Sequence, residues 1–362
     1  MGNSTGRLYR ITTFGESHGG GVGVIIDGCP AGYSLDLEKV SDWLRRRRPG
    51  QSHLSSPRDE KDEVECLSGL ARGITLGTPI MLLVRNKDQK ADHYNDLESV
   101  YRPSHADYTT DIKFGTKAPS GGGRASARET IGRVAAGAVA EQMLGHLAPK
   151  LQVTAWVDSV KGVRATIASP EAVTREQVEE NPLRCPSQDA NQLEAEIIKA
   201  KKRGDSVGGT IYCQVTCPPT GLGEPVFDKL EAELAKGMMS LPASKGFEIG
   251  SGFEGTHMYG SEHNDVFYHD EQGQVRTKTN RSGGIQGGIS NGETIYFKVA
   301  FKPVATIFRK QETVTTSGED VVMAPKQGRH DPCVLPRAVP IVEATALNII
   351  LDHLLIQSHV GL

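Results

Sequence analysis

The sequence predicts a protein of mixed α and β structure, in the α/β or α+β class. Segments with the alternating apolar pattern of β-strands are separated by segments with helical periodicity rather than by hairpin turns alone. Neither a Pro- or Ser-rich linker nor a repeat of fixed period interrupts the 362 residues, so we expect one large domain over residues 1–362. The expected strands are residues 8–13, 22–27, 74–84, 151–160, 210–216 and 294–301.

The first expected helix ends in four consecutive arginines. Leu37, Val40 and Leu44 recur at helical spacing, and the Pro-Gly pair 49–50 should end the helix just after residues 45–48. Such an arginine run is usually a solvated helix end that complements the helix dipole. It also suits a clamp for a multiply charged small molecule. Contact with RNA is a third interpretation, but no aromatic residues are interleaved as stacking platforms.

Two longer helices have recognisable starts. A helix over residues 126–146 should open with a capping box formed by Ser126 and Glu129. A strongly apolar helix should begin with Pro340 near its first turn, and its charged residues argue against a membrane span. Shorter helices are expected over residues 191–202 and 227–239.

Composition limits the classes of function. The chain has 41 Lys and Arg against 44 Asp and Glu, a net charge of −3, which provides no general attraction to nucleic acid or anionic lipid. Its six cysteines form no CxxC pair, so we expect no zinc site and no disulfide scaffold. The N-terminus lacks an apolar signal-peptide core, and no run of 18 apolar residues occurs. We therefore expect a reduced, cytoplasmic protein without membrane or nucleic-acid partners.

Two glycine clusters are candidate binding loops. In residues 120–129 three consecutive glycines precede a predicted helix N-terminus, where unpaired N–H groups and the helix dipole favour anions. Arg124, Arg128 and Arg133 add guanidinium groups that can bind an oxyanion with two hydrogen bonds. The pattern indicates a phosphate cradle, although a tight turn with an ordinary cap fits the spacing equally well. The second cluster, residues 281–292, allows close approach of a flat ligand, and a β-bulge explains it as well.

Three polar segments carry groups suited to proton transfer. His18 lies in residues 13–19 and His105 in residues 102–108, both near glycines or other small polar residues. Histidine is the natural proton donor near neutral pH, but a single histidine is more often structural. Residues 328–333 place a histidine and an aspartate just before a predicted helix. As an alternative, that segment is an ordinary polar turn.

Taken together, these segments resemble the signatures of the chorismate synthase family. They occur in the family's order and cover essentially the whole chain. The resemblance implies an α/β (α+β) sandwich with helices layered between antiparallel β-sheets, assembled as a homotetramer. The matching segments are residues 13–19, 46–50, 102–108, 121–124, 126–130 and 328–333.

The resemblance also implies an activity. The family converts 5-enolpyruvylshikimate 3-phosphate to chorismate by 1,4-elimination of phosphate, the last step of the shikimate pathway, and it requires reduced FMN. A cationic pocket within a mildly acidic protein suits a substrate with two carboxylates and a phosphate. Two other classes compete with this interpretation: a nucleic-acid-binding protein, and a flavin enzyme that passes hydride from nicotinamide. The lack of a dinucleotide-binding fingerprint argues against the second.

Residue roles follow from the same match. His18 would protonate the departing phosphate, His105 the reduced flavin, and Asp331 would assist proton transfer, with Ser17 and Ser126 as candidate relays. The candidate substrate-binding residues are Arg47, Arg48, Arg133 and Arg337.

The match extends to cofactor contacts. For NADPH, Arg47 and His53 occupy the matching positions, but His53 stands where some members carry an arginine, which argues against intrinsic reduction of flavin by NADPH. The FMN positions are Arg124, Ala125, Ser126, Pro242, Ala243, Gly287, Lys302, Pro303, Val304, Ala305, Thr306 and Arg329.

Overall fold

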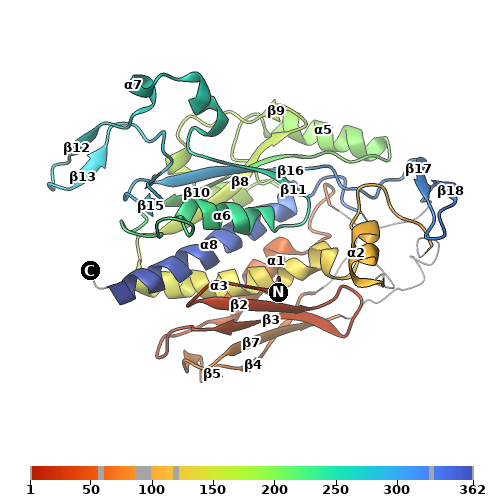
Figure 1. Ribbon diagram of the computed structural model, residues 1–362, viewed down its shortest axis with the longest axis horizontal. Helices are drawn as coiled ribbons and strands as arrows, with labels where there is room; N and C mark the ends of the chain where they lie inside the picture. The colour runs from red at the N-terminus through yellow and green to blue at the C-terminus, as the bar shows by residue number, and fades with distance from the viewer. Residues whose placement is uncertain (1, 56–60, 87–98, 117–121, 326–329, 361–362) are drawn as a thin grey trace.

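Helices lie between two antiparallel β-sheets in the computed structural model (Figure 1). The structure describes residues 2–55, 61–86, 99–116, 122–325 and 330–360. Both sheets and the helices between them contribute to one connected cluster of buried apolar residues. The sandwich implied by the family resemblance is therefore confirmed.

The N-terminal sheet has five strands in the order β1-β2-β3-β7-β4, and all its neighbours are antiparallel. Alternation along the central strands turns Val24 and Ile26 inward, where both side chains are fully buried. The expected strand over residues 74–84 is interrupted near Gly77, which has φ +74°, and forms two strands. The five strands are β1 (Ser4–Thr5), β2 (Arg10–Gly15), β3 (Gly21–Asp27), β4 (Val64–Ser68) and β7 (Ile80–Arg85), and β6 (Ile74–Thr75) lies outside this sheet.

The second sheet also has five strands, in the order β11-β16-β10-β8-β9. Its strands are β8 (Gln152–Val160), β9 (Val163–Arg164), β10 (Gly209–Thr216), β11 (Ser244–Ile249) and β16 (Ile295–Phe301). Short pairs complete the described β-structure. They use β5 (Leu70–Ala71) with β6, β12 (Phe267–His269) with β13 (Val275–Thr277), β14 (Ile285–Gln286) with β15 (Ile289–Ser290), and β17 (Gln311–Val314) with β18 (Asp320–Met323).

The helices between the sheets pack closely because small residues meet at their contacts. A Cβ at Gly137 would lie 2.4 Å from the Cβ of Ala344, and one at Gly132 would lie 2.6 Å from the carbonyl oxygen of Gly23. The helix α3 (Thr130–Leu147) therefore fits tightly against both α8 (Leu335–Val360) and the N-terminal sheet.

The other described α-helices of the chain are α1 (Leu37–Arg47), α2 (Asp107–Phe114), α4 (Arg175–Glu179), α5 (Ala190–Lys202), α6 (Leu230–Met239) and α7 (Gly260–His263).

The start of α3 differs from the sequence prediction. Two 3₁₀ turns, residues 123–125 and 127–129, precede the α-helix, which begins at Thr130. The Ser126 hydroxyl accepts from the backbone N–H of Arg128, and no capping box forms with Glu129. The Glu129 carboxylate instead accepts from Thr13 and Arg133, so a tertiary contact replaces the local cap.

The start of α8 differs as well. The helix begins at Leu335, which puts Pro340 inside it rather than at its first turn. Proline has no N–H, so the carbonyl oxygen of Pro336 lacks its helical partner, and the buried Arg184 guanidinium donates to it. Among the described helices, α8 alone is long and apolar enough to cross a membrane, but 78% of its apolar window is buried within the protein, as in a core helix.

Candidate active site

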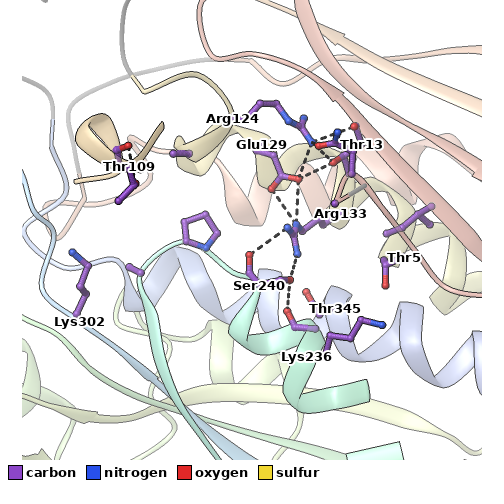
Figure 2. Close-up of a pocket in the computed structure, with 18 of the residues that line it drawn as sticks. Thr5, Thr13, Thr109, Arg124, Glu129, Arg133, Lys236, Ser240, Lys302 and Thr345 are labelled. Atoms are coloured by element: carbon purple, nitrogen blue, oxygen red, sulfur yellow. Dashed lines mark hydrogen bonds and ion pairs between the residues drawn. The ribbon is translucent and has the colours of Figure 1, made fainter. Parts of the chain in front are cut away.

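A cavity of about 770 Å³ lies where the N-terminal strands meet α6, α8 and two loops (Figure 2). Its walls come from residues 2–5, residues 104–106, the segment before α3, the C-terminal end of α6 and residues 302–305. The volume is within the range of about 300–1,000 Å³ typical of small-molecule and cofactor sites.

The cavity wall carries more cations than anions. Arg124, Arg133, Lys236 and Lys302 line it, and Glu129 is the carboxylate among its described lining residues. Figure 2 shows Glu129 between the two guanidinium groups, with Oε2 3.0 Å from Nε of Arg133 and Oε1 3.7 Å from Arg124. One carboxylate cannot balance four cations, so the cavity favours anionic ligands.

Hydrogen bonds to neighbouring elements hold both guanidinium groups in place. Arg124 donates to the hydroxyl of Thr13 at 2.7 Å and to the carbonyl oxygen of Gly15 at 3.2 Å. Arg133 reaches across to Ser240 at the end of α6, with Nη1 2.6 Å from its hydroxyl. The two arginines therefore join the N-terminal sheet to α6 around the cavity.

Lys302 follows β16 and contacts the histidine-bearing segment. Its Nζ donates to the carbonyl oxygen of Ser104 at 2.9 Å. Burial and the nearby Lys245 lower the pKa of the Lys302 ammonium group. A negatively charged ligand at this end of the cavity would stabilise its charged form.

His105 lines the cavity and is backed by an ion pair. Its Nδ1 lies 2.8 Å from Oδ1 of Asp107, and Arg102 donates to both carboxylate oxygens of Asp107. Burial raises the pKa of the Asp107 carboxyl, but the hydrogen bonds and charges of Arg102 and His105 outweigh it, so that pKa lies well below its usual range. Asp107 is thus a carboxylate near neutral pH.

His330 belongs to the same electrostatic cluster. Burial lowers its pKa to about 4, the positive charges of Arg102 and His105 act in the same direction, and Asp331 opposes them. The His330 ring is therefore neutral near pH 7. Its neighbour Asp331 forms an ion pair with Arg337, which also donates to the backbone carbonyl of Arg47 at 3.2 Å.

His18 lies on the turn between β2 and β3, outside the cavity wall. The hydroxyl of Ser17 is 3.0 Å from its Nδ1. Asn86 donates from its side-chain amide to the carbonyl oxygens of Glu16 at 2.9 Å and Gly19 at 2.6 Å, so one side chain spans the whole turn.

A buried chain of ion pairs supports Asn86. Its Oδ1 accepts from Nε of Arg128 at 2.5 Å, and Arg128 also contacts Asp62 at 3.2 Å. The other oxygen of Asp62 accepts from Arg47 at 2.9 Å, and Arg47 donates to the carbonyl oxygen of Ala127. The turn that carries His18 is thus fixed by residues from four separate parts of the chain.

The arginine run at the end of α1 divides into different environments. Arg45 pairs with Asp42 on the exposed side, whereas Arg46 and Arg47 are held by buried or half-buried carboxylates. Arg48 is half-buried, and its guanidinium makes no hydrogen bond or ion pair with the residues that the structure describes. Of the three interpretations, the solvated helix end therefore applies to Arg45, and Arg48 is the member available to a ligand.

A family model described as chorismate synthase matches residues 9–355. The chain belongs to the chorismate synthase family. Chorismate synthase from Synechococcus elongatus is 59% identical over 358 residues, which are 99% of this chain and 98% of that protein. The enzyme from Methylacidiphilum infernorum is 57% identical over 363 residues, 100% of this chain and 98% of that protein. A crystal structure of chorismate synthase superimposes with a TM-score of 0.76 at 30% identity and covers 98% of this chain and 93% of that one.

The cavity brings together most of the positions that the chorismate synthase resemblance implied for FMN. They come from three separate segments of the chain, and His105 and Arg133 join them on the same wall. Those positions are Arg124, Ala125, Pro242, Ala243, Lys302, Pro303, Val304 and Ala305.

The other predicted positions are not among the described residues that line the cavity. Ser126 caps a 3₁₀ turn, and Thr306 is buried. Gly287 lies between β14 and β15, and the carbonyl oxygen of its neighbour Gly288 accepts from the backbone N–H of Leu230. Leu230 begins α6, whereas Pro242 follows the other end of that helix. His53 bonds to Glu194 on the surface of α5, whereas the Arg47 guanidinium points to Asp62. Arg329 is outside the residues that the structure describes.

Several residues that shape the candidate site were not predicted from the sequence. Asp107 had a local signal, because it stands two residues after His105 in the same polar segment. Asp62, Asn86, Lys236 and Ser240 had none, because each meets its partners only through the fold.

Proposed function

We propose that this chain catalyses the 1,4-elimination of phosphate from 5-enolpyruvylshikimate 3-phosphate to give chorismate, with reduced FMN as cofactor. It would then be a carbon-oxygen lyase that performs the last step of the shikimate pathway. Besides membership of the family, one observation carries the proposal: His105 lies on the wall of a cavity whose described lining residues include four cations and one carboxylate.

The residues present fit a reduced flavin mononucleotide. The cavity has the size of a cofactor site, and Pro242, Ala243 and residues 303–305 give it an apolar stretch for a flat ring. Lys302 and Arg124 are suited to the flavin phosphate or to the anionic reduced ring. FMN would thus be held between the end of α6 and the loop after β16.

The substrate would be held by guanidinium groups. It carries two carboxylates and one phosphate, and Arg48 and Arg133 are half-buried and oriented by α1 and α3. Arg337 and Arg47 lie next to each other through the hydrogen bond between them. In our proposal Arg47 mainly positions Arg337 and Asp62 rather than binding substrate, since Asp62 already neutralises its guanidinium group.

Two bonds break in the reaction. The allylic carbon-oxygen bond breaks with its electron pair leaving on phosphate, and a ring carbon loses a proton, so there is no net redox change. His18 would donate a proton to the departing phosphate, with Ser17 as its hydrogen-bonded relay. The chemistry that reduced FMN supplies when bound is a transient electron and a proton acceptor, and no side chain of this chain can supply the electron.

The remaining proton-transfer groups would act on the flavin. With Nδ1 bound to Asp107, the cationic ring of His105 would transfer a proton to the flavin from Nε2, and Asp331 would assist proton transfer at the flavin's central ring. Asp331 is oriented for this role by its ion pair with Arg337. Ser126 keeps its place as a second candidate relay.

We further propose that the reductant of the flavin is external. Arg47 and His53, the positions associated with NADPH, bond in different directions, to Asp62 and Glu194 respectively. We also propose a cytoplasmic homotetramer without nucleic-acid or membrane partners. The family resemblance supports the homotetramer, and the net charge of −3 argues against attraction to nucleic acid or anionic lipid.

Anaerobic incubation of the chain with photoreduced FMN and 5-enolpyruvylshikimate 3-phosphate tests the proposed function. Phosphate and chorismate are measured together, and a second arm contains oxidised FMN and NADPH. Equal amounts of both products with reduced flavin only are expected. Products in the NADPH arm would contradict the external reductant, and no product in either arm from folded protein that binds FMN would contradict the synthase.

The proton-donor role of His18 has its own test. His18→Ala should lower turnover about a hundredfold, the lower range for general acid-base catalysis, while the melting temperature changes little. His269→Ala, a change of the same kind at an exposed position of β12, is the control and should keep normal turnover. Near-normal turnover in His18→Ala would remove the histidine from the mechanism.

A further inference from the structure

We propose that Asp107 is a positioning residue that fixes the ring of His105 in its Nδ1–H tautomer and thereby presents Nε2 to the cavity. What His105 then does to a bound flavin rests on the proposed function. The tautomer itself is a property of this chain and is measurable without any ligand.

Both carboxylate oxygens of Asp107 accept hydrogen bonds. Its side chain is 3% exposed, Oδ2 accepts from Nε of Arg102 at 2.6 Å, and Oδ1 accepts from the other arm of the same guanidinium at 2.7 Å. A carboxylate paired in this way with Arg102 is ionised and can only accept hydrogen bonds. Nδ1 of His105, 2.8 Å from Oδ1, must therefore carry the hydrogen.

The opposite edge of the ring faces the glycine loop before α3. A Cβ at Gly122 would lie 2.9 Å from Cε1 and 3.3 Å from Nε2 of His105, and Gly122 has φ +89°. Glycine is needed there both for the backbone conformation and for the close approach. Because the His105 side chain is 19% exposed and lines the cavity, its free nitrogen lies at the cavity edge.

The helix α2 holds the Asp107 carboxylate in a fixed position. Asp107 is the first residue of that helix, where the dipole favours a negative charge. A purely structural role for Asp107, as an anchor for Arg102 and the helix start, makes a different prediction. It implies that the state of the His105 ring does not depend on the carboxylate.

The test is a long-range ¹H–¹⁵N correlation spectrum of the ligand-free chain labelled with ¹⁵N-histidine. The ring signals of His105 are assigned by their disappearance in His105→Gln. In the native chain we expect Nδ1 to be protonated and Nε2 to be free in the neutral ring. An Nε2–H tautomer in the native chain would overturn the proposal, and this result needs no variant to fold.

Asp107→Asn then separates positioning from anchoring. An amide can offer either its oxygen or its NH₂ group to Nδ1, so the Nδ1–H form should give way to a mixture or to the Nε2–H form. Asp111→Asn is the matched control on the same helix, where Asp111 accepts from the hydroxyl of Tyr101 at 2.6 Å. It should leave the His105 signals unchanged. An unchanged tautomer in Asp107→Asn would overturn the proposal.

Turnover with reduced FMN gives the second readout. Asp107→Asn should lose about tenfold or more in kcat, part of what a general acid provides, with little change in the Michaelis constant. The two proposals fail differently. A native chain with the expected tautomer and no chorismate would contradict the proposed function alone, whereas full turnover in Asp107→Asn would contradict the link between tautomer and activity.

Discussion

The arginines around Trp43 and the cations of the cavity use similar residues in opposite ways. Behind α1, the guanidinium carbons of Arg46 and Arg175 lie 4.8 and 4.6 Å from the centre of the Trp43 ring. Carboxylates match them closely there: Glu141, Glu179 and Glu343 pair with Arg46, Arg175 and Arg184. Among the described residues that line the cavity, one carboxylate faces four cations. The balanced charges around Trp43 hold elements of the fold together, whereas the excess positive charge of the cavity is available to bind an anionic ligand.

Glu343 is the centre of this arginine network. Its side chain is fully buried, one oxygen accepts from Arg46 at 2.7 Å, and the other accepts from the backbone N–H of Ala155 at 2.9 Å. The network thereby joins α1, α8 and β8. Burial lowers the pKa of Arg184 in the same network, but Glu179 and Glu343 counteract that effect.

Removing the charge of Glu343 should have the largest effect on stability. Glu343→Gln keeps an acceptor for Ala155 but leaves Arg46 undercompensated, so the free energy of unfolding should fall by about 3–5 kcal/mol. Urea denaturation measures it. Glu194→Gln, which breaks an exposed pair with His53, is the control and should cost less than about 1 kcal/mol. Equal losses in the two variants would show that burial of the network does not matter.

The cavity cations should behave in the reverse way. Lys302→Gln should weaken binding of reduced FMN about ten- to a hundredfold, the worth of one charged hydrogen bond, with little change in unfolding. Anaerobic titration measures the Kd. The matched control is Lys298→Gln on β16, which is not among the residues lining the cavity. If Lys302→Gln destabilised the fold and left the Kd unchanged, the contrast between the two regions would be wrong.

Within the arginine run, the same contrast predicts unequal neighbours. Arg48→Gln should raise the Michaelis constant for 5-enolpyruvylshikimate 3-phosphate about tenfold, because its guanidinium is not neutralised by a described residue. Arg45→Gln, which loses an exposed pair with Asp42, should change neither substrate binding nor stability measurably. Steady-state kinetics of both variants decide it, and equal Michaelis constants would deny Arg48 a role in binding.

The burial of His330 near Arg102 should also appear in the pH dependence of stability. The pKa of His330 is about 4 in the folded chain, against about 6.5 when unfolded. From pH 6.5 down to 4 the unfolded chain binds a proton that the folded chain does not, so the free energy of unfolding falls across that window and levels off below it.

His330→Asn should remove this part of the acid sensitivity. Because the ring is half-buried, we expect the variant to lose about 1 kcal/mol less than the native chain between pH 6.5 and 4. Urea denaturation at pH 7, 5 and 4 measures the difference, in which the other titrating groups cancel. Parallel curves for the two proteins would mean that His330 titrates normally in the folded chain.

Periodicity predicted the elements better than their ends. Strands β2, β3, β7, β8, β10 and β16 and helices α1, α3, α5 and α6 lie within a few residues of their expected positions because each has a regular apolar face, whereas β1, β4, β9 and β11 were not predicted. The capping box at Ser126 was wrong because Glu129 binds Arg133 instead. Strand pairing and order were beyond reach, since an alternating pattern does not name its neighbour.

In the candidate site too, residues within motifs were predicted and their distant partners were not. His18 and His105 were found because whole motifs surround them, and these motifs also led to the family. Their supports were not found: Asn86 follows its strand without any distinctive pattern, and Asp62 meets Arg47 and Arg128 only after α1 and α3 have packed. Whether an arginine is neutralised depends on such distant partners, so the sequence could not rank Arg45 to Arg48.

A crystal structure of the chain with FMN and 5-enolpyruvylshikimate 3-phosphate tests most directly whether the cation-rich cavity is the flavin site. We predict the flavin ring within the cavity, near Nε2 of His105 and the ammonium group of Lys302, with substrate anions at Arg48 and Arg337. FMN bound elsewhere, with only solvent between Arg124, Arg133 and Lys302, would contradict it.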